Sequence, residues 1–184
     1  MLVIGGVGGF AAYTLSKNVA DLGHVQIPAV RNQTLADMMH DGLRAVVLRT
    51  IIAVKSADAE AVNECRDELA EFSANFMEYI ANLEKLPLDN DIKHTISVLK
   101  PELKDYLEQS QLISSVAREQ GADAAIAQLP AFQKSFKALE VSMGNLGDAI
   151  QTNAENSVRT DDERNTKMMW LLVAVMVLAI GLAL

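Results

Sequence analysis

Cysteine, proline and aromatic residues are scarce in this 184-residue sequence, which has one cysteine, four prolines and 5% aromatic side chains. A single cysteine excludes an internal disulfide. The helical spacing of Cys65 from Val62 and Leu69 predicts a packed thiol, and a bond between two chains is the alternative. The alternation of apolar and polar residues that is typical of strands is also lacking. These absences favour an all-α protein with long helices.

The sequence also lacks the residue patterns of catalytic and cofactor sites. It contains no Gly-rich phosphate loop, no Ser/His/Asp set and no Cys/His cluster. Its histidines, His24, His40 and His94, are too far apart to share a metal or haem on one helix. The net charge of −8 and the lack of a basic patch argue against nucleic acid as a partner. We therefore predict a non-enzyme that binds no metal and no cofactor.

Charged residues are missing from both ends of the chain. Residues 1–16 and 168–184 contain no Asp, Glu, Lys or Arg. The second run corresponds to roughly 26 Å of helix, slightly less than a bilayer core of about 30 Å. We interpret 1–16 and 168–184 as two truncated transmembrane helices, with residues 17–167 forming a domain on one side of the membrane. An uncleaved signal sequence is the alternative for residues 1–16.

Apolar residues repeat every three or four positions through the middle of the chain, which predicts amphipathic helices. Turn residues divide this region into four helices, expected over about 17–55, 58–86, 91–120 and from Pro130 onward. Pro28 predicts a kink or break near residues 25–27. Gly121 is expected to close the third helix, and Pro130 to open a fourth that runs unbroken into residues 168–184. Short connections then favour an elongated antiparallel up-down-up-down four-helix bundle.

This layout resembles the periplasmic part of methyl-accepting chemotaxis proteins of the four-helix-bundle type. Residues 35–44, LADMMHDGLR, are similar to the first-helix pattern of many such receptors. Residues 127–132, AQLPAF, are similar to the opening of the fourth helix. The resemblance covers the whole chain. It implies a homodimer in the bacterial inner membrane, with residues 17–167 on the periplasmic or extracellular side.

The resemblance also implies a ligand site at the membrane-distal dimer interface, on the first and fourth helices. In the aspartate receptor of this family, three arginines of the first helix hold the ligand's carboxylates. Arg44 and Arg49 match two of them in spacing, but Ala53 stands at the third position. The family's threonine near the start of the fourth helix would fall near Pro130 or Ala131 and is missing. These departures argue against aspartate and leave another amino acid or organic acid as the expected ligand.

Five residues are expected to form the ligand site: His40, Arg44, Arg49, Phe132 and Gln133. A guanidinium can hold a carboxylate with two parallel hydrogen bonds, which suits the two arginines to this role. The alternative is that both arginines are solvated or salt-bridged on the helix surface. For His40 the alternative is a hydrogen-bonded histidine at an interface.

Together these features predict the sensor module of a chemotaxis receptor. A small, anionic ligand would bind across two subunits and shift the fourth helix and the following transmembrane helix slightly. One alternative places the same module on a histidine kinase or a diguanylate cyclase. Another is a membrane-tethered structural bundle that binds a partner protein and no small molecule.

Overall fold

The computed structural model describes the backbone of residues 2–181 and the side chains of residues 9–174 other than 11, 158, 160–165, 168 and 172. The described residues form helices and no strand, as predicted. The helices are α1 (Leu2–Asp21), the π-helix η1 (Leu22–Gln26), α2 (Ile27–Lys55), α3 (Ala59–Lys85), α4 (Asn90–Gln120) and α5 (Ala122–Gly181). The chain divides into two compact units, residues 29–150 and residues 1–28 with 151–184.

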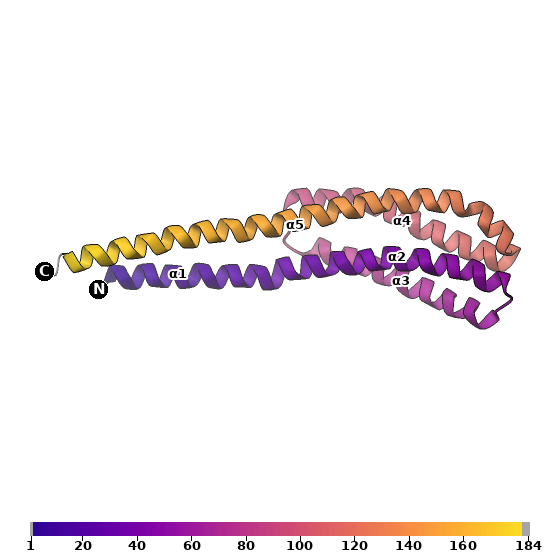
Figure 1. The fold of residues 1–184 in the computed structure, drawn as a ribbon, viewed down its shortest axis with the longest axis horizontal. Helices are drawn as coiled ribbons and strands as arrows, with labels where there is room; N and C mark the ends of the chain where they lie inside the picture. The colour runs from indigo at the N-terminus through magenta and orange to yellow at the C-terminus, as the bar shows by residue number, and fades with distance from the viewer. Residues whose placement is uncertain (1, 182–184) are drawn as a thin grey trace. The chain divides into compact units, whose positions relative to one another are not determined.

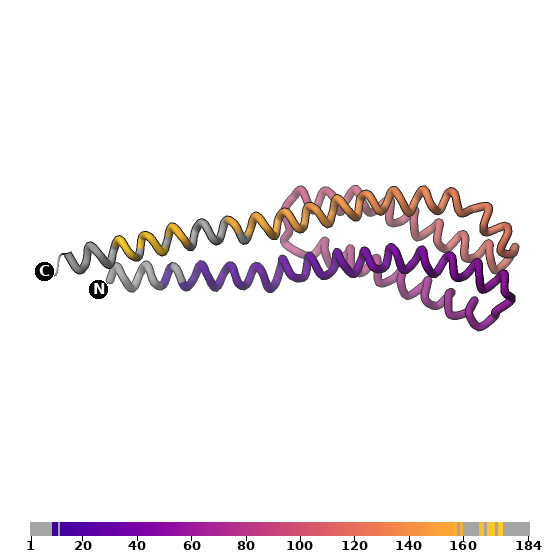
Figure 2. The backbone as a smooth tube through the Cα atoms, in the orientation of Figure 1, coloured from indigo at the N-terminus to yellow at the C-terminus, as the bar shows by residue number. Residues whose placement is uncertain are grey.

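Residues 29–150 form the predicted four-helix bundle, from α2, α3, α4 and the first part of α5 (Figure 1). Consecutive helices lie side by side and run in opposite directions, and Figure 2 traces the short turns between them. Each helix contributes one apolar face to a shared core, because apolar residues at three- and four-residue spacing fall on one side of a helix. The largest fully buried side chains are Tyr106, Phe76, Phe132, Leu43, Leu83, Ile96, Leu99, Ile113, Leu139, Met143, Leu146 and Val46.

The turn between α2 and α3 follows from local residue chemistry. Ala57 adopts a positive φ of 55°, and Asp58 is the N-cap of α3. The Asp58 carboxylate accepts a hydrogen bond from the backbone N–H of Ala61 at 3.0 Å. This bond satisfies one of the amides that a helix start leaves without a partner. The predicted buried thiol is confirmed as well, since Cys65 is 1% exposed.

Pro28 widens the helix before it, and the chain stays helical. The prediction allowed either a kink or a break near residues 25–27; the structure has the π-helix η1, in which the N–H of Ile27 bonds to the carbonyl of Leu22. A proline has no N–H and its ring collides with the carbonyl four residues earlier, here that of His24. A wider turn moves that carbonyl aside.

The fourth bundle helix begins earlier than predicted. Gly121 ends α4 with a φ of 94° and an N–H bond to the carbonyl of Ala117, as expected for a C-terminal glycine. Helix α5 then starts at Ala122, so the expectation that Pro130 opens it was wrong. Pro130 lies inside the helix, where it removes one backbone hydrogen bond. The alanines among residues 122–129 favour helix strongly enough to extend it by two turns before that proline.

Among the described residues, no helix carries a stretch both apolar and long enough to cross a membrane. The predicted spans 1–16 and 168–184 extend into residue 1 and residues 182–184, which lie outside the described part. Both spans, and the domain limits drawn from them, stay predictions.

Two glycine substitutions should change stability in opposite directions. Gly121→Ala forces a side chain into a conformation that L-residues avoid and should lower the free energy of unfolding by roughly 1–3 kcal/mol. Gly144→Ala adds a Cβ in open space inside α5 and should raise it by up to about 1 kcal/mol. Urea unfolding followed by circular dichroism measures both. A stabilising Gly121→Ala would contradict this account of the α4–α5 turn.

Candidate functional site

His40 lies in the core of the bundle and joins α2 to α5. Its side chain is buried, and Nε2 lies 3.2 Å from the backbone carbonyl oxygen of Phe136. Since a carbonyl only accepts, Nε2 must carry the proton and donate. The imidazole also stacks on the Phe136 ring, with 4.2 Å between centroids and 8° between planes. One residue of α2 is thus attached to both the backbone and the side chain of one residue of α5.

Aromatic rings from three helices surround the imidazole. Tyr106 of α4 lies 5.1 Å from the His40 ring, and its hydroxyl donates to the His40 backbone carbonyl at 2.8 Å. Phe132 of α5 stacks on Tyr106 at 5.4 Å, and Phe76 of α3 meets His40 edge-on at 6.5 Å. These five rings, His40, Phe76, Tyr106, Phe132 and Phe136, form what we call the aromatic layer. All four bundle helices contribute to it.

Burial in the aromatic layer affects the protonation of its two titratable side chains, His40 and Tyr106. Burial lowers the pKa of His40 below 6.5, because a charged imidazolium would lose its hydration. The bond to Phe136 and the carboxylates of Asp41, Asp37 and Glu140 oppose this effect only in part. Burial likewise raises the pKa of Tyr106. Both side chains are therefore neutral near pH 7, and the layer holds its geometry without a buried charge.

Arg44 borders the aromatic layer. It lies one turn after His40 on α2 and is half-buried. Its guanidinium carbon lies 4.5 Å from the centroid of the Phe136 ring, which is a cation–π contact. Phe136 therefore touches both His40 and Arg44. A guanidinium carries five N–H donors, and the half-buried Arg44 side chain leaves part of them open to solvent and to an anion.

Arg49 pairs with a carboxylate of α3. Its guanidinium forms an ion pair with Glu68 of α3 at 2.6 Å, and its side chain is 49% exposed. This matches the salt-bridged alternative considered for the arginines. Such an exposed pair contributes little stability, at most about 1 kcal/mol, so the guanidinium can exchange partners at low cost.

The structure brings together only part of the expected site. His40, Arg44 and Phe132 belong to or border the aromatic layer, while Arg49 pairs with another helix. Gln133 is half-buried on α5, one residue after Phe132. Ala53 is 5% exposed, so the position of the family's third arginine faces the bundle core. Burying a guanidinium at this position would cost its hydration, so a small apolar side chain suits it better.

Sequence reasoning did not foresee the roles of Phe136, Tyr106 and Glu68. Phe136 and Tyr106 lie on the apolar stripes that predicted the core, so their burial was expected. The sequence held one indication of these roles. His40 is a polar residue on an apolar stripe, and a buried imidazole needs a hydrogen-bond partner. Among the described residues, no group of three His, Cys, Asp or Glu side chains is placed to hold a metal ion.

Residues 1–168 match a family model described as a four-helix-bundle sensory module for signal transduction. The match includes all of the bundle and the aromatic layer. No curated protein and no solved structure is similar enough to the chain to count as a match.

The buried imidazole predicts a loss of stability in acid. Below about pH 6.5 the unfolded chain protonates His40 while the folded chain, with its lowered pKa, does not. The free energy of unfolding should therefore fall as the pH drops from about 6.5 toward the folded pKa, by at most about 1.4 kcal/mol per pH unit. Urea unfolding at a series of pH values measures this slope.

His40→Gln keeps a donor for the Phe136 carbonyl but cannot titrate, so its slope in this window should be smaller than that of the unchanged chain. His94→Gln, at an exposed position of α4, is the matched control and should leave the slope unchanged. Equal slopes in all three proteins would show that His40 is not the titrating group.

Proposed function

The chain belongs to the family of four-helix-bundle sensory modules for signal transduction, and from this premise we propose that it is the sensory module of a methyl-accepting chemotaxis receptor. In this proposal two copies form a homodimer along α2. A small carboxylate-bearing ligand, such as an amino acid or organic acid, binds between them at Arg44 and Arg49. Binding moves α5 slightly, and that movement is the signal.

The observation that carries the proposal is a second apolar stripe on α2, on the face that the bundle leaves exposed. Val30, Met38, Leu48 and Ile52 are 45%, 57%, 39% and 65% exposed. Together with Thr34, Asp41 and Ala45, all of them exposed, they follow one another at three- and four-residue steps. We call these seven residues the outer stripe. Five of the seven are apolar, and an exposed, mainly apolar seam with this spacing is typical of helices that pair with another helix.

The two arginines flank the outer stripe on opposite sides. At 3.6 residues per turn, Arg44 lies about 75° to one side of the stripe's centre and Arg49 about 65° to the other. In a parallel pair of α2 helices related by a two-fold axis, opposite flanks of the two copies adjoin. Arg44 of one protomer would then lie on the same side of the dimer as Arg49 of the partner subunit. This arrangement supports a ligand held by both subunits.

The aromatic layer supplies a route from this site to α5. A ligand carboxylate that draws the Arg44 guanidinium away from Phe136 would weaken its contact with α5. His40 attaches the same turn of α2 to the Phe136 carbonyl, so a rotation of α2 also pulls on α5. Packed helices shift by an angstrom or two without repacking their cores. Helix α5 continues to Gly181, which supports it as the element that carries the movement onward.

The proposal places the bundle outside the cell membrane, on the periplasmic or extracellular side. Support comes from the uncharged runs 1–16 and 168–184, which precede and follow the bundle, and from the family. An even number of bundle helices returns the chain to the side from which it started. Both runs would then anchor the same face of the bundle.

A charge in the outer stripe should disrupt the dimer. Met38→Asp adds a carboxylate one turn before Asp41 in each copy, so four like charges would gather near the two-fold axis, and it should raise the dimer's Kd at least about tenfold. Sedimentation of the 184-residue chain at several concentrations measures this. Val98→Asp, at a 49% exposed apolar position on α4, is the matched control and should leave the association unchanged. An undiminished dimer in Met38→Asp would remove the outer stripe as the interface.

Loss of either arginine should weaken ligand binding. Calorimetry of the 184-residue chain with amino acids and dicarboxylic acids should identify a ligand whose Kd rises about tenfold or more in Arg44→Ala and in Arg49→Ala. Arg31→Ala is the control, since Arg31 lies on the same flank as Arg49 about five turns earlier. If a ligand binds but neither variant changes its affinity, the arginines do not hold it.

A further inference from the structure

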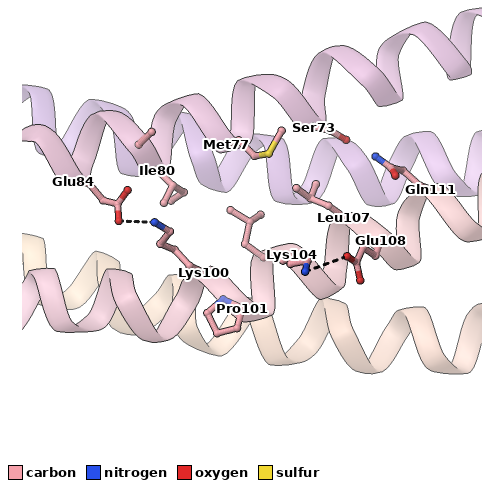
Figure 3. Close-up of a pocket in the computed structure, with 12 residues that line it drawn as sticks. Ser73, Met77, Ile80, Glu84, Lys100, Pro101, Lys104, Leu107, Glu108 and Gln111 are labelled. Atoms are coloured by element: carbon pink, nitrogen blue, oxygen red, sulfur yellow. Dashed lines mark hydrogen bonds and ion pairs between the residues drawn. The ribbon is translucent and has the colours of Figure 1, made fainter.

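A groove between α3 and α4 shares no residue with the outer stripe or the aromatic layer. Its volume is about 630 Å³ (Figure 3). Side chains of both helices line it, among them Ser73, Met77, Ile80 and Ala81 of α3 and Lys104 and Leu107 of α4. Figure 3 shows Ile80 and Leu107 facing the space between the two helices, and Met77 lines the groove along α3. Neither Arg44 nor Arg49 takes part.

Small and constrained residues explain why the groove is open. Ser73 and Ala81 leave gaps two turns apart on α3, where larger side chains would reach α4. The Ser73 hydroxyl donates to the carbonyl of Leu69 at 2.6 Å, so it faces its own helix. On α4, Pro101 has a compact ring, and the side chain of Lys104 is 77% exposed. The floor that remains is apolar.

The charges around the groove are not evenly placed. Glu84 forms an ion pair with Lys100 at 2.8 Å and closes one end between the two helices. Lys104 lies one turn after Lys100 and pairs loosely with Glu108, at 3.7 Å. Lys104 therefore lies near the middle of the α4 rim, between Lys100, which pairs with Glu84 at one end, and Glu108 one turn further along. The two lysines and two glutamates balance in number, and the charge nearest the middle of the apolar floor is the ammonium of Lys104.

We infer that this groove is a second ligand site, which takes an organic monocarboxylate with an apolar body. The body lies on Met77, Ile80 and Leu107, and the carboxylate binds the ammonium of Lys104 next to Lys100. The volume suits an aryl- or alkyl-chain acid, since ligand pockets measure roughly 300–1,000 Å³. An ammonium ligand on the same floor fits less well, because its charge would lie beside the like charge of Lys104.

Lys104 is the group best placed to bind the carboxylate. Its present bond to Glu108 is long and joins residues one turn apart on one helix, which is worth at most about 0.5 kcal/mol. A ligand carboxylate can replace it at little cost. Lys100 keeps its bond to Glu84 and adds only its positive field. The site shares no residue with the proposed dimer interface. Its test can therefore fail while the proposed function holds, and the reverse is also true.

The test measures binding of three matched probes to the whole 184-residue chain in lipid nanodiscs: 3-phenylpropionate, 3-phenylpropan-1-ol and 3-phenylpropylammonium. Empty nanodiscs correct for partition into lipid. Calorimetry should show saturable binding of the carboxylate, with a Kd of about 1 mM or tighter. The alcohol and the ammonium should bind at least about fivefold more weakly, since each lacks the charge that Lys104 attracts.

Two substitutions at exposed positions test whether the probes bind in this groove. Lys104→Met should weaken carboxylate binding about fivefold and leave the alcohol unaffected. Met77→Gln, at a 52% exposed position of the floor, should weaken all three probes. Lys93→Met is the control, an exposed lysine of α4 outside the groove, and should change nothing.

Three outcomes would overturn the inference. They are no saturable binding of the carboxylate, equal affinity for acid and alcohol, and carboxylate binding that Lys104→Met leaves intact. Sedimentation of Met77→Gln tests whether a second copy of the chain occupies the groove. Weaker self-association in that variant would replace the small ligand with a protein contact.

Discussion

The contact between His40 and Phe136 is the interaction on which the proposed mechanism depends. A buried imidazole must donate its proton somewhere, and here the acceptor is a backbone carbonyl of α5. The bond determines which turn of α2 faces which turn of α5. It places Arg44, one turn later, against the Phe136 ring. The residue proposed to meet the ligand therefore touches the helix proposed to move.

Helix α2 also has more apolar surface than the bundle can bury. Its inner stripe, including Leu43, Val46 and Val47, is fully covered by the other helices. Its outer stripe, including Met38 and Ile52, is covered by no described residue to the same degree. An apolar seam along one helix is most simply covered by the same seam of a second copy. A dimer would place Arg44 of one protomer beside Arg49 of the partner subunit. The same interface would then both join the two copies and bind the ligand.

Helix number, most helix bounds and the core were predictable from the sequence, because they depend on local chemistry. Apolar spacing marked the buried faces, and Asp58 and Gly121 marked helix ends. The start of α5 was mispredicted because proline suits a first helical turn but is also tolerated within a long helix when the residues before it favour helix strongly. The partners of His40 and Arg49 could not be predicted, since Phe136 and Glu68 meet them only through the rotation and register of neighbouring helices. The α3–α4 groove could not be predicted either. It arises from two small residues, Ser73 and Ala81, which form no recognisable pattern in the sequence.

The central claim is that two copies meet along the outer stripe of α2. Disulfide cross-linking tests it most directly, with Ala45→Cys at the middle of the stripe and Ala70→Cys on the exposed surface of α3 as the control. Native Cys65 is buried and can remain. A two-fold axis through the stripe brings the two copies of position 45 within disulfide reach, a Cα separation of about 4.4–6.8 Å. We expect rapid formation of a covalent dimer in Ala45→Cys and not in Ala70→Cys under mild oxidation. Equal cross-linking of both variants, or cross-linking of Ala70→Cys alone, would contradict the account.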